Sequence, residues 1–193
     1  MKLNRILACG LVVSAAALLA ACSSDNNDHK DNTPPAEETD FPFADDEAFL
    51  DYLQKTHMNY MWEGAEPNSG LAPERIHLDG EYPQNDRDVV TTGGSGFGIA
   101  GLISAIDRGF IPRQEGVGRL EKIVDFLGKA DRFHGVWPHW MSGPTGKVVP
   151  FGQKDNGGDL VESSFLMTSL IIAREYFKNG NEQEKALAEN IDK

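Results

Sequence analysis

The sequence contains almost no cysteine, and this scarcity excludes two classes of protein. Both cysteines, Cys9 and Cys22, lie within the first 22 of the 193 residues. A disulfide-stabilised scaffold is therefore excluded for the rest of the chain, because such scaffolds need several spaced cysteines. Thiol catalysis is excluded there as well, because no cysteine sulfur remains to act as a nucleophile.

Positive charge is also scarce. The chain has 18 Lys and Arg against 30 Asp and Glu, a formal net charge of −12 at pH 7, and its basic residues form no cluster. Because binding to a phosphate backbone needs clustered positive charge, no nucleic-acid partner is predicted. Glycine and proline number 20 and 10, too few for a low-complexity chain, so the composition is that of an ordinary acidic globular protein.

Residues 1–21 are typical of a secretory signal. Lys2 and Arg5 precede an apolar run over 6–21, which is shorter than the roughly 20 residues of a membrane span. The run ends Leu-Ala-Ala-Cys, which resembles the lipobox of bacterial lipoproteins. That resemblance implies lipidation of Cys22, which would anchor the protein to a membrane. The alternative is a plain signal with a chance cysteine.

Residues 22–42 are predicted to be an acidic, flexible tether. The stretch SSDNNDHKDNTPPAEETD (23–40) has no large apolar residue, so it cannot bury enough surface to offset the entropy of ordering. Acidic residues just after the cysteine resemble the surface-export signal of Bacteroidetes lipoproteins. This implies an outer-membrane lipoprotein displayed on the cell envelope, whereas the alternative is a simple solvated linker.

Residues 43–193 are predicted to form an all-α domain. Apolar residues recur at three- and four-residue spacing in five segments, and no convincing strand pattern appears. The segments 88–92 and 147–150 are at most short hairpin pieces. Long loops are expected over 63–88 and 131–154, and loops of this length are often functional. The predicted helices span 45–61, 95–108, 113–130, 159–177 and 182–192.

Several motifs that bind cofactors or metals occur here only in incomplete form. Gly96–Gly101 reads GxGxxG, but a helical segment follows where a dinucleotide site needs a second strand, so close helix packing is the preferred interpretation. The acidic segment 155–162 lacks EF-hand spacing, although another oxygen-ligand site stays open. His134 and His139 are five apart and lack the HExxH pattern. No cofactor and no metal site are therefore predicted.

Three carboxylates gather where the second long loop meets the fourth predicted helix. Asp159 and Glu162 are three residues apart and share one helix face, and Asp155 precedes them across a Gly-Gly pair. Glu162 is the candidate proton donor, because neighbouring apolar residues would raise its pKa. Asp159 would stay ionised at the helix N-terminus, and Asp155 would position substrate. The alternative is a helix cap beside a solvated glutamate.

The preceding loop adds aromatic and imidazole groups that suit a sugar. Trp faces stack on sugar rings, and His side chains hydrogen-bond hydroxyl groups. The alternative for the Trp pair is to close the core. The first long loop and the helix before it contribute a second polar-aromatic group. The candidate substrate-binding residues are His134, Trp137, His139, Trp140, Arg75 and Trp62.

Four blocks of sequence resemble a known family. They are MNYMWEGAEPNSGLAPER (58–75), TTGGSGFGIAGLISAIDRGFI (91–111), RFHGVWPHWMSGPTGKVVPF (132–151) and KDNGGDLVESSFLMTSLIIAREYF (154–177). They are similar to the glucoamylase-like proteins of glycoside hydrolase family 144, which degrade β-1,2-glucan. The resemblance implies an (α/α)6 toroid, inverting hydrolysis, and an acidic trio that falls on Asp155, Asp159 and Glu162.

The number of helices indicates that only the N-terminal portion of such a toroid is present. Five helices are predicted in 43–193, whereas the toroid has twelve, so an incomplete domain is expected. The expected function is a secreted hydrolase of β-1,2-glucan or its oligosaccharides when full length, with this chain alone inactive. The alternatives are a surface lipoprotein that binds glycan without cleaving it, and an inactive remnant.

Overall fold

The computed structural model describes residues 42–193, and these contain five helices and three short strands. The predicted all-α class is confirmed, and the bounds of every predicted helix agree to within three residues. The helices are α2 (Asp46–Trp62), α3 (Thr92–Asp107), α4 (Arg113–Lys129), α5 (Leu160–Phe177) and α6 (Glu182–Ile191).

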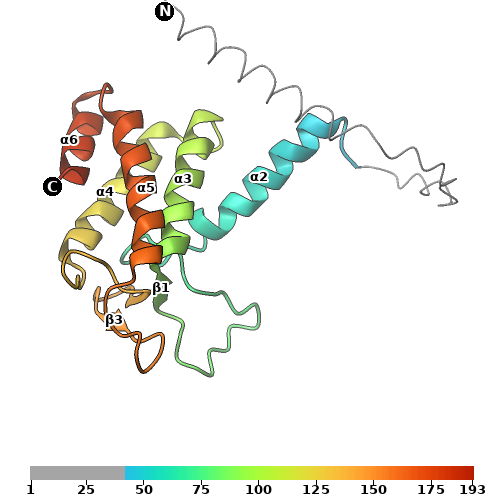
Figure 1. The fold of residues 1–193 in the computed structure, drawn as a ribbon. Coiled ribbons are helices and arrows are strands. Elements are labelled where there is room, and N and C mark those ends of the chain that lie inside the picture. The colour runs from blue at the N-terminus through green and yellow to red at the C-terminus, as the bar shows by residue number, and fades with distance from the viewer. Residues whose placement is uncertain (1–41) are drawn as a thin grey trace, which may run out of the picture. The chain divides into compact units, whose positions relative to one another are not determined.

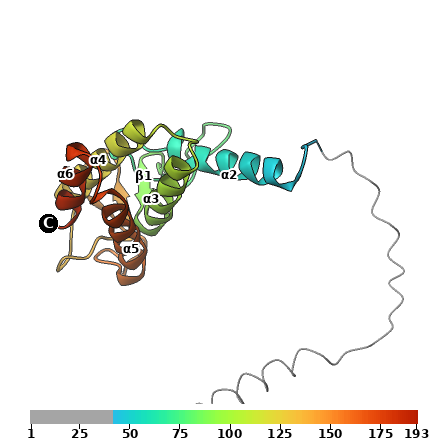
Figure 2. The ribbon, with the colours of Figure 1, turned by 90° about the horizontal axis from the view of Figure 1, so that it is seen from above.

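Helices α3 and α5 lie side by side and run in the same direction, as both ribbon views show (Figures 1 and 2). Gly93 of α3 lies against Glu162 of α5, and Gly96, one turn later, lies against the backbone of Phe165 and Leu166. A Cβ atom added at Gly96 would come within 2.7 Å of that backbone. The absence of a side chain at Gly96 therefore permits the close approach of the two helices.

The opposite side of α3 contacts α2. A Cβ on Gly98 would lie 3.0 Å from the Met61 sulfur, and one on Gly101 would lie 3.4 Å from the Met58 sulfur. The packing interpretation of the GxGxxG segment is thus confirmed, because its glycines face neighbouring helices. The amphipathic pattern of α2 differs from expectation, since α2 has no fully buried residue. Met58 and Met61 in its C-terminal turns pack on the glycines of α3, and Glu47, Asp51 and Gln54 nearer its start bond to Arg108, the C-cap of α3.

The core lies between α3, α4, α5 and α6. Helix α4 presents a regular apolar stripe, and α5 contributes the side chains that close the core from the other side. Burial of each such aliphatic side chain stabilises the fold by about 1.5–3 kcal/mol. The largest fully buried apolar side chains of the described residues are Phe177, Leu71, Ile99, Leu120, Met141, Leu166 and Leu187.

A small antiparallel sheet corrects the loop predictions. Strand β2 (Trp140–Ser142) lies between β1 (Val89–Thr91) and β3 (Val148–Val149), so the segment 131–154 is not an unbroken loop. Strands of two or three residues are too short to show a sequence period, and β1 pairs with a strand far away in the sequence. The sheet lies near the N-terminal ends of α3 and α5 (Figure 1).

Helix α6 is attached to α4 by an ion pair in which the carboxylate is buried and the arginine is 43% exposed. The Glu184 carboxylate, whose side chain is 5% exposed, accepts hydrogen bonds from Arg113 Nε at 2.6 Å and from Arg113 Nη2 at 3.1 Å. Asn181 and Glu184 also form a reciprocal capping box at the start of α6. The Arg113 guanidinium lowers the pKa of Glu184 below its ordinary value.

Replacing Glu184 with Gln is expected to destabilise the protein by about 1.5–3 kcal/mol, the usual range for hydrogen bonds to charged groups. The pKa of Glu184 is lower in the folded protein than in the unfolded chain. The stabilisation is therefore complete above the ordinary Glu pKa of about 4.3 and is lost as the pH falls through the lowered value. Thermal unfolding of both proteins between pH 3 and 7 measures this.

The matched control for that experiment is Glu182→Gln. The Glu182 side chain is 92% exposed and pairs with Lys185 on the surface of the same helix, so its replacement should change stability by at most about 0.5 kcal/mol. A difference between wild type and Glu184→Gln that stayed constant down to pH 3 would contradict the assigned ion pair.

None of the helices within residues 42–193 combines the length and the hydropathy that a membrane-spanning helix requires. The predicted signal peptide, the lipidation site Cys22 and almost all of the predicted tether lie outside the described residues.

Candidate active site

Asp159 is the best-connected of the predicted acids. It is the N-cap of α5, where its Oδ1 accepts the Val161 N–H at 2.9 Å and the Glu162 N–H at 3.0 Å. Its other oxygen, Oδ2, lies 2.9 Å from Nδ1 of His139. Because a carboxylate only accepts hydrogen bonds, Nδ1 of His139 carries the proton in this pair.

The surroundings of Asp159 favour its ionised form. Partial burial raises the pKa of the Asp159 carboxyl, but the hydrogen bonds from the Glu162 N–H and the His139 ring outweigh burial. The net result is a pKa below the ordinary value. Asp159 is therefore a carboxylate at neutral pH, suited to orienting a water molecule or a sugar hydroxyl group.

Asp155 joins Asp159 and His139 in one compact group. One ligating atom from each of the three side chains lies within 4.8 Å of the others, and all three residues are half-buried. The turn that places Asp155 is closed by hydrogen bonds between its backbone and that of Gly152. Such a group could coordinate a cation, although both oxygens of Asp159 already accept hydrogen bonds within the protein.

Glu162 occupies a different environment from the one that the sequence predicted. Its Oε2 accepts the Gly93 N–H at 2.9 Å, which places the carboxyl group at the first turn of α3. The apolar neighbours expected to enclose it are mostly turned away, since Leu160 and Phe165 are exposed. Glu162 therefore joins the N-terminal ends of α3 and α5, and it is not a member of the His139–Asp155–Asp159 group.

Trp137 is a core residue, which corrects its assignment to a sugar platform. Its side chain is 6% exposed, and its indole Nε1 donates to the Leu127 carbonyl at 3.2 Å. Its backbone N–H also bonds to the Ser163 hydroxyl of α5. The alternative interpretation of this residue, that it closes the core, is the correct one.

His134 lies in a tight turn and is exposed. Phe133 and Val136 exchange two backbone hydrogen bonds, and the two residues between them, His134 and Gly135, have φ values of 55° and 90°. His134 is therefore one of the two central residues of a tight turn, and its position is explained by the backbone of that turn. His134 is not part of the acidic group.

Trp140 lies on the sheet, beside the acidic group. Its indole Nε1 donates to Glu74 Oε2 at 2.9 Å, and its ring meets His139 edge-on with centroids 5.7 Å apart. Arg75, the next residue after Glu74, pairs with Asp86 at 3.3 Å. Arg75 thus lies beside the residue that holds Trp140, on the edge of the site.

Trp62, the last predicted sugar-binding residue, serves the packing of α2. Its ring lies 4.4 Å beneath the Arg119 guanidinium, and its carbonyl accepts a hydrogen bond from Arg119. Burial lowers the pKa of the Arg119 guanidinium below its ordinary value. The structure therefore brings Trp140 and His139 together with the acids, and leaves Trp62 in the α2–α4 contact.

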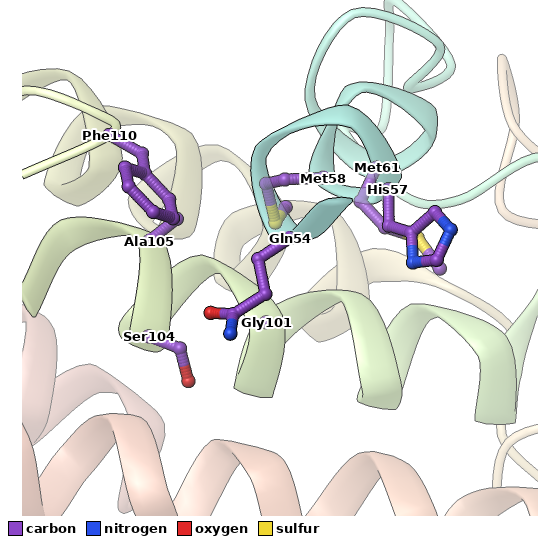
Figure 3. Close-up of a pocket in the computed structure, with 8 residues that line it drawn as sticks. All are labelled: Gln54, His57, Met58, Met61, Gly101, Ser104, Ala105 and Phe110. Atoms are coloured by element: carbon purple, nitrogen blue, oxygen red, sulfur yellow. The ribbon is translucent and has the colours of Figure 1, made fainter. Parts of the chain in front are cut away.

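A separate hollow of about 320 Å³ lies between α2 and α3 (Figure 3). Its walls are mostly apolar and none of the predicted site residues lines it, so the acidic group remains the better candidate for catalysis. The residues that line it are Gln54, His57, Met58, Met61, Gly101, Ser104, Ala105 and Phe110.

Sequence reasoning missed two contributors to the site, Glu74 and Phe151. Phe151 stacks on the His139 ring with centroids 4.1 Å apart and an angle of 16° between the planes. Both residues fall inside the blocks quoted for the family resemblance, and Phe151 is four residues before Asp155. The short distance in sequence between Phe151 and Asp155 was the signal that could have identified Phe151 as a site residue.

Comparison with known proteins identifies close relatives. The exo-β-1,2-glucooligosaccharide sophorohydrolase of Parabacteroides distasonis is 51% identical over 155 residues. The solved endo-β-1,2-glucanase of Chitinophaga pinensis, in complex with sophorotriose and glucose, is 59% identical with a TM-score of 0.75 over 77% of this chain. The resemblance to the β-1,2-glucanases of glycoside hydrolase family 144 is confirmed. No family model matches the chain.

The relatives also confirm the architecture. The solved β-1,2-glucanase of Parabacteroides distasonis matches with a TM-score of 0.70 at 52% identity, over 77% of this chain. The β-1,2-glucanase-like chain described here has the fold of part of such a helical toroid. It spans 20% of the sophorohydrolase, 35% of the Chitinophaga pinensis chain and 20% of the Parabacteroides distasonis chain.

Proposed function

We propose that the protein contributes to a glycoside hydrolase that cleaves β-1,2-glucan or its oligosaccharides with inversion. The observation that carries this proposal is the group formed by His139, Asp155 and Asp159 at the end of the helices, beside the Trp140 ring. Glycosidases need carboxyl groups in unequal protonation states, and Asp159 is held in the ionised state. The relatives named above act on β-1,2-linked glucose chains.

Each acid has a distinct role in the proposed reaction. Asp159, ionised and fixed by His139, orients a water molecule or a sugar hydroxyl group. Asp155, on the turn beside it, positions the substrate. Glu162 is proposed as the proton donor because the family resemblance places it in the acidic trio. Its Oε2 accepts the Gly93 N–H, and its Oε1 would carry the transferred proton.

Incubating linear β-1,2-glucan with the protein expressed from its complete gene tests this proposal. Release of new reducing ends is expected, and NMR of the first product should show the α-anomer, since inversion changes the configuration of the cleaved carbon. β-1,3- and β-1,4-glucans serve as linkage controls. If the protein bound β-1,2-glucan without cleaving it, the proposed hydrolase would be wrong and the alternative function, a glycan-binding lipoprotein, would be supported.

We also propose that the protein is an outer-membrane lipoprotein anchored through Cys22. The support is the apolar run over 6–21 that ends in Leu-Ala-Ala-Cys. Cells expressing wild type or Cys22→Ser would be labelled with a tagged fatty acid. The wild type should take up the label, and Cys22→Ser should lose it completely. Cys9→Ser is the matched control and should keep the label, so labelled Cys22→Ser protein would refute the proposal.

A further inference from the structure

We propose that Phe151 forms a sugar-stacking subsite next to the acidic group, an inference that rests on the proposed glucan hydrolase. Phe151 is 51% exposed although it is a large aromatic residue. One face of its ring is covered by His139, and its position leaves a substantial part of the ring open to solvent. Pyranose rings present flat C–H faces, which pack well on an exposed aromatic ring.

The ring of Phe151 is fixed by contacts on several sides. The Phe151 N–H donates to the Asp155 carbonyl at 2.9 Å, so the aromatic residue and the acid belong to one turn. The Trp140 indole meets the Phe151 ring edge-on, with centroids 4.8 Å apart and an interplanar angle of 71°. A ring held in this way loses little conformational freedom when a ligand stacks on it.

Glu74 extends this arrangement to the first long loop. Its carboxylate accepts the Trp140 indole N–H at 2.9 Å, and its backbone N–H donates to the Val89 carbonyl at the edge of the sheet. Glu74 is therefore a positioning residue: it holds Trp140, which in turn packs against Phe151. The subsite thus combines an exposed ring with a support built from two loops and the sheet.

The stacking order places the subsite relative to the reaction. His139 lies between Phe151 and Asp159, because it stacks on the first and hydrogen-bonds to the second. A sugar on the open side of Phe151 would therefore continue the order Asp159, His139, Phe151, sugar, with two rings between it and Asp159. We assign Phe151 to a sugar unit that neighbours the cleaved bond, so it should affect substrate affinity more than the chemical step.

The test compares Phe151→Ala with Phe151→Trp in the protein expressed from its complete gene. For β-1,2-glucooligosaccharides, Phe151→Ala should raise KM and Kd about 3- to 10-fold, the range expected for loss of an aromatic contact, with kcat little changed. Phe151→Trp should restore both constants. The effect should already be present for the shortest oligosaccharide that is cleaved, because every cleaved substrate places a sugar unit next to the cleaved bond.

Tyr52→Ala is the matched control, since Tyr52 is an aromatic residue with 55% exposure on α2. It should leave KM and Kd unchanged. If Phe151→Ala left KM and Kd unchanged, the proposed subsite would be wrong. A fall in kcat alone that Phe151→Trp did not restore would also contradict it. Phe151-dependent binding of another glucooligosaccharide, without cleavage of β-1,2-glucan, would refute the hydrolase and keep the subsite. No binding of any glucooligosaccharide would refute both.

Discussion

Replacing Asp159 with Asn is expected to lower the turnover of β-1,2-glucan by about 10²- to 10⁴-fold, the contribution of a positioned acid or base. Asn keeps the shape of the side chain and is itself a good N-cap, so α5 should stay intact. What is lost is the negative charge of the carboxylate that accepts a hydrogen bond from the Nδ1–H group of His139. Reducing-end release from the protein expressed from its complete gene measures turnover, and circular dichroism confirms the fold.

Asp45→Asn provides a matched control for the Asp159 substitution. Asp45 caps α2 through a 2.8 Å hydrogen bond from the Ala48 N–H, so the same chemical change is made at a cap outside the site. The turnover of Asp45→Asn should equal that of wild type.

The turnover of Glu162→Gln should fall by as much as that of Asp159→Asn. If both amide variants turned over at near-wild-type rates, these acids would be a helix cap and a link between helices, and the catalytic assignment would fail.

Replacing Gly96 with Ala is expected to destabilise the protein by about 1–3 kcal/mol or more, the cost of overpacking a close contact. The new Cβ would lie 2.7 Å from backbone atoms of Phe165 and Leu166, and backbone cannot rotate away as a side chain can. Helices α3 and α5 would have to separate. The gain in helix propensity of about 1 kcal/mol offsets only part of this cost.

Gly118→Ala separates the packing cost from helix propensity. Gly118 lies inside α4, and a Cβ there meets nothing within 4 Å. This substitution should stabilise the protein by about 0.5–1 kcal/mol. Thermal unfolding of both variants gives the comparison. Equal unfolding temperatures for the two variants would contradict the close contact of α3 with α5.

The helices and their caps could be predicted from the sequence because their signals are local. Asp45 and Asp159 both precede apolar segments of helical period, and both cap helices in the structure. The glycines of the GxGxxG segment likewise indicated close packing. The partner helices could not be inferred, because which helix faces Gly96 depends on how α3, α4 and α5 are arranged.

The site was harder to predict, because most of its contacts join distant segments. The Trp140–Glu74 hydrogen bond spans 66 positions, and Glu162 reaches Gly93 across 69. Trp137 and Trp140 are three residues apart, yet one closes the core and the other lies on the sheet. Composition and spacing identified the acids and the aromatic loop, but only the sheet determines which of the two tryptophans contacts His139 of the acidic group.

The contact between α3 and α5 also has a consequence for folding kinetics. Helical proteins usually fold rapidly because most of their contacts are local, and loop closure becomes more costly by about 0.6 kcal/mol for each doubling of loop length. Here the main helix pair is joined by a hydrogen bond between residues 69 positions apart, with α4 and β2 between them. Despite its helical content, this chain should therefore fold more slowly than a bundle of sequential helical hairpins.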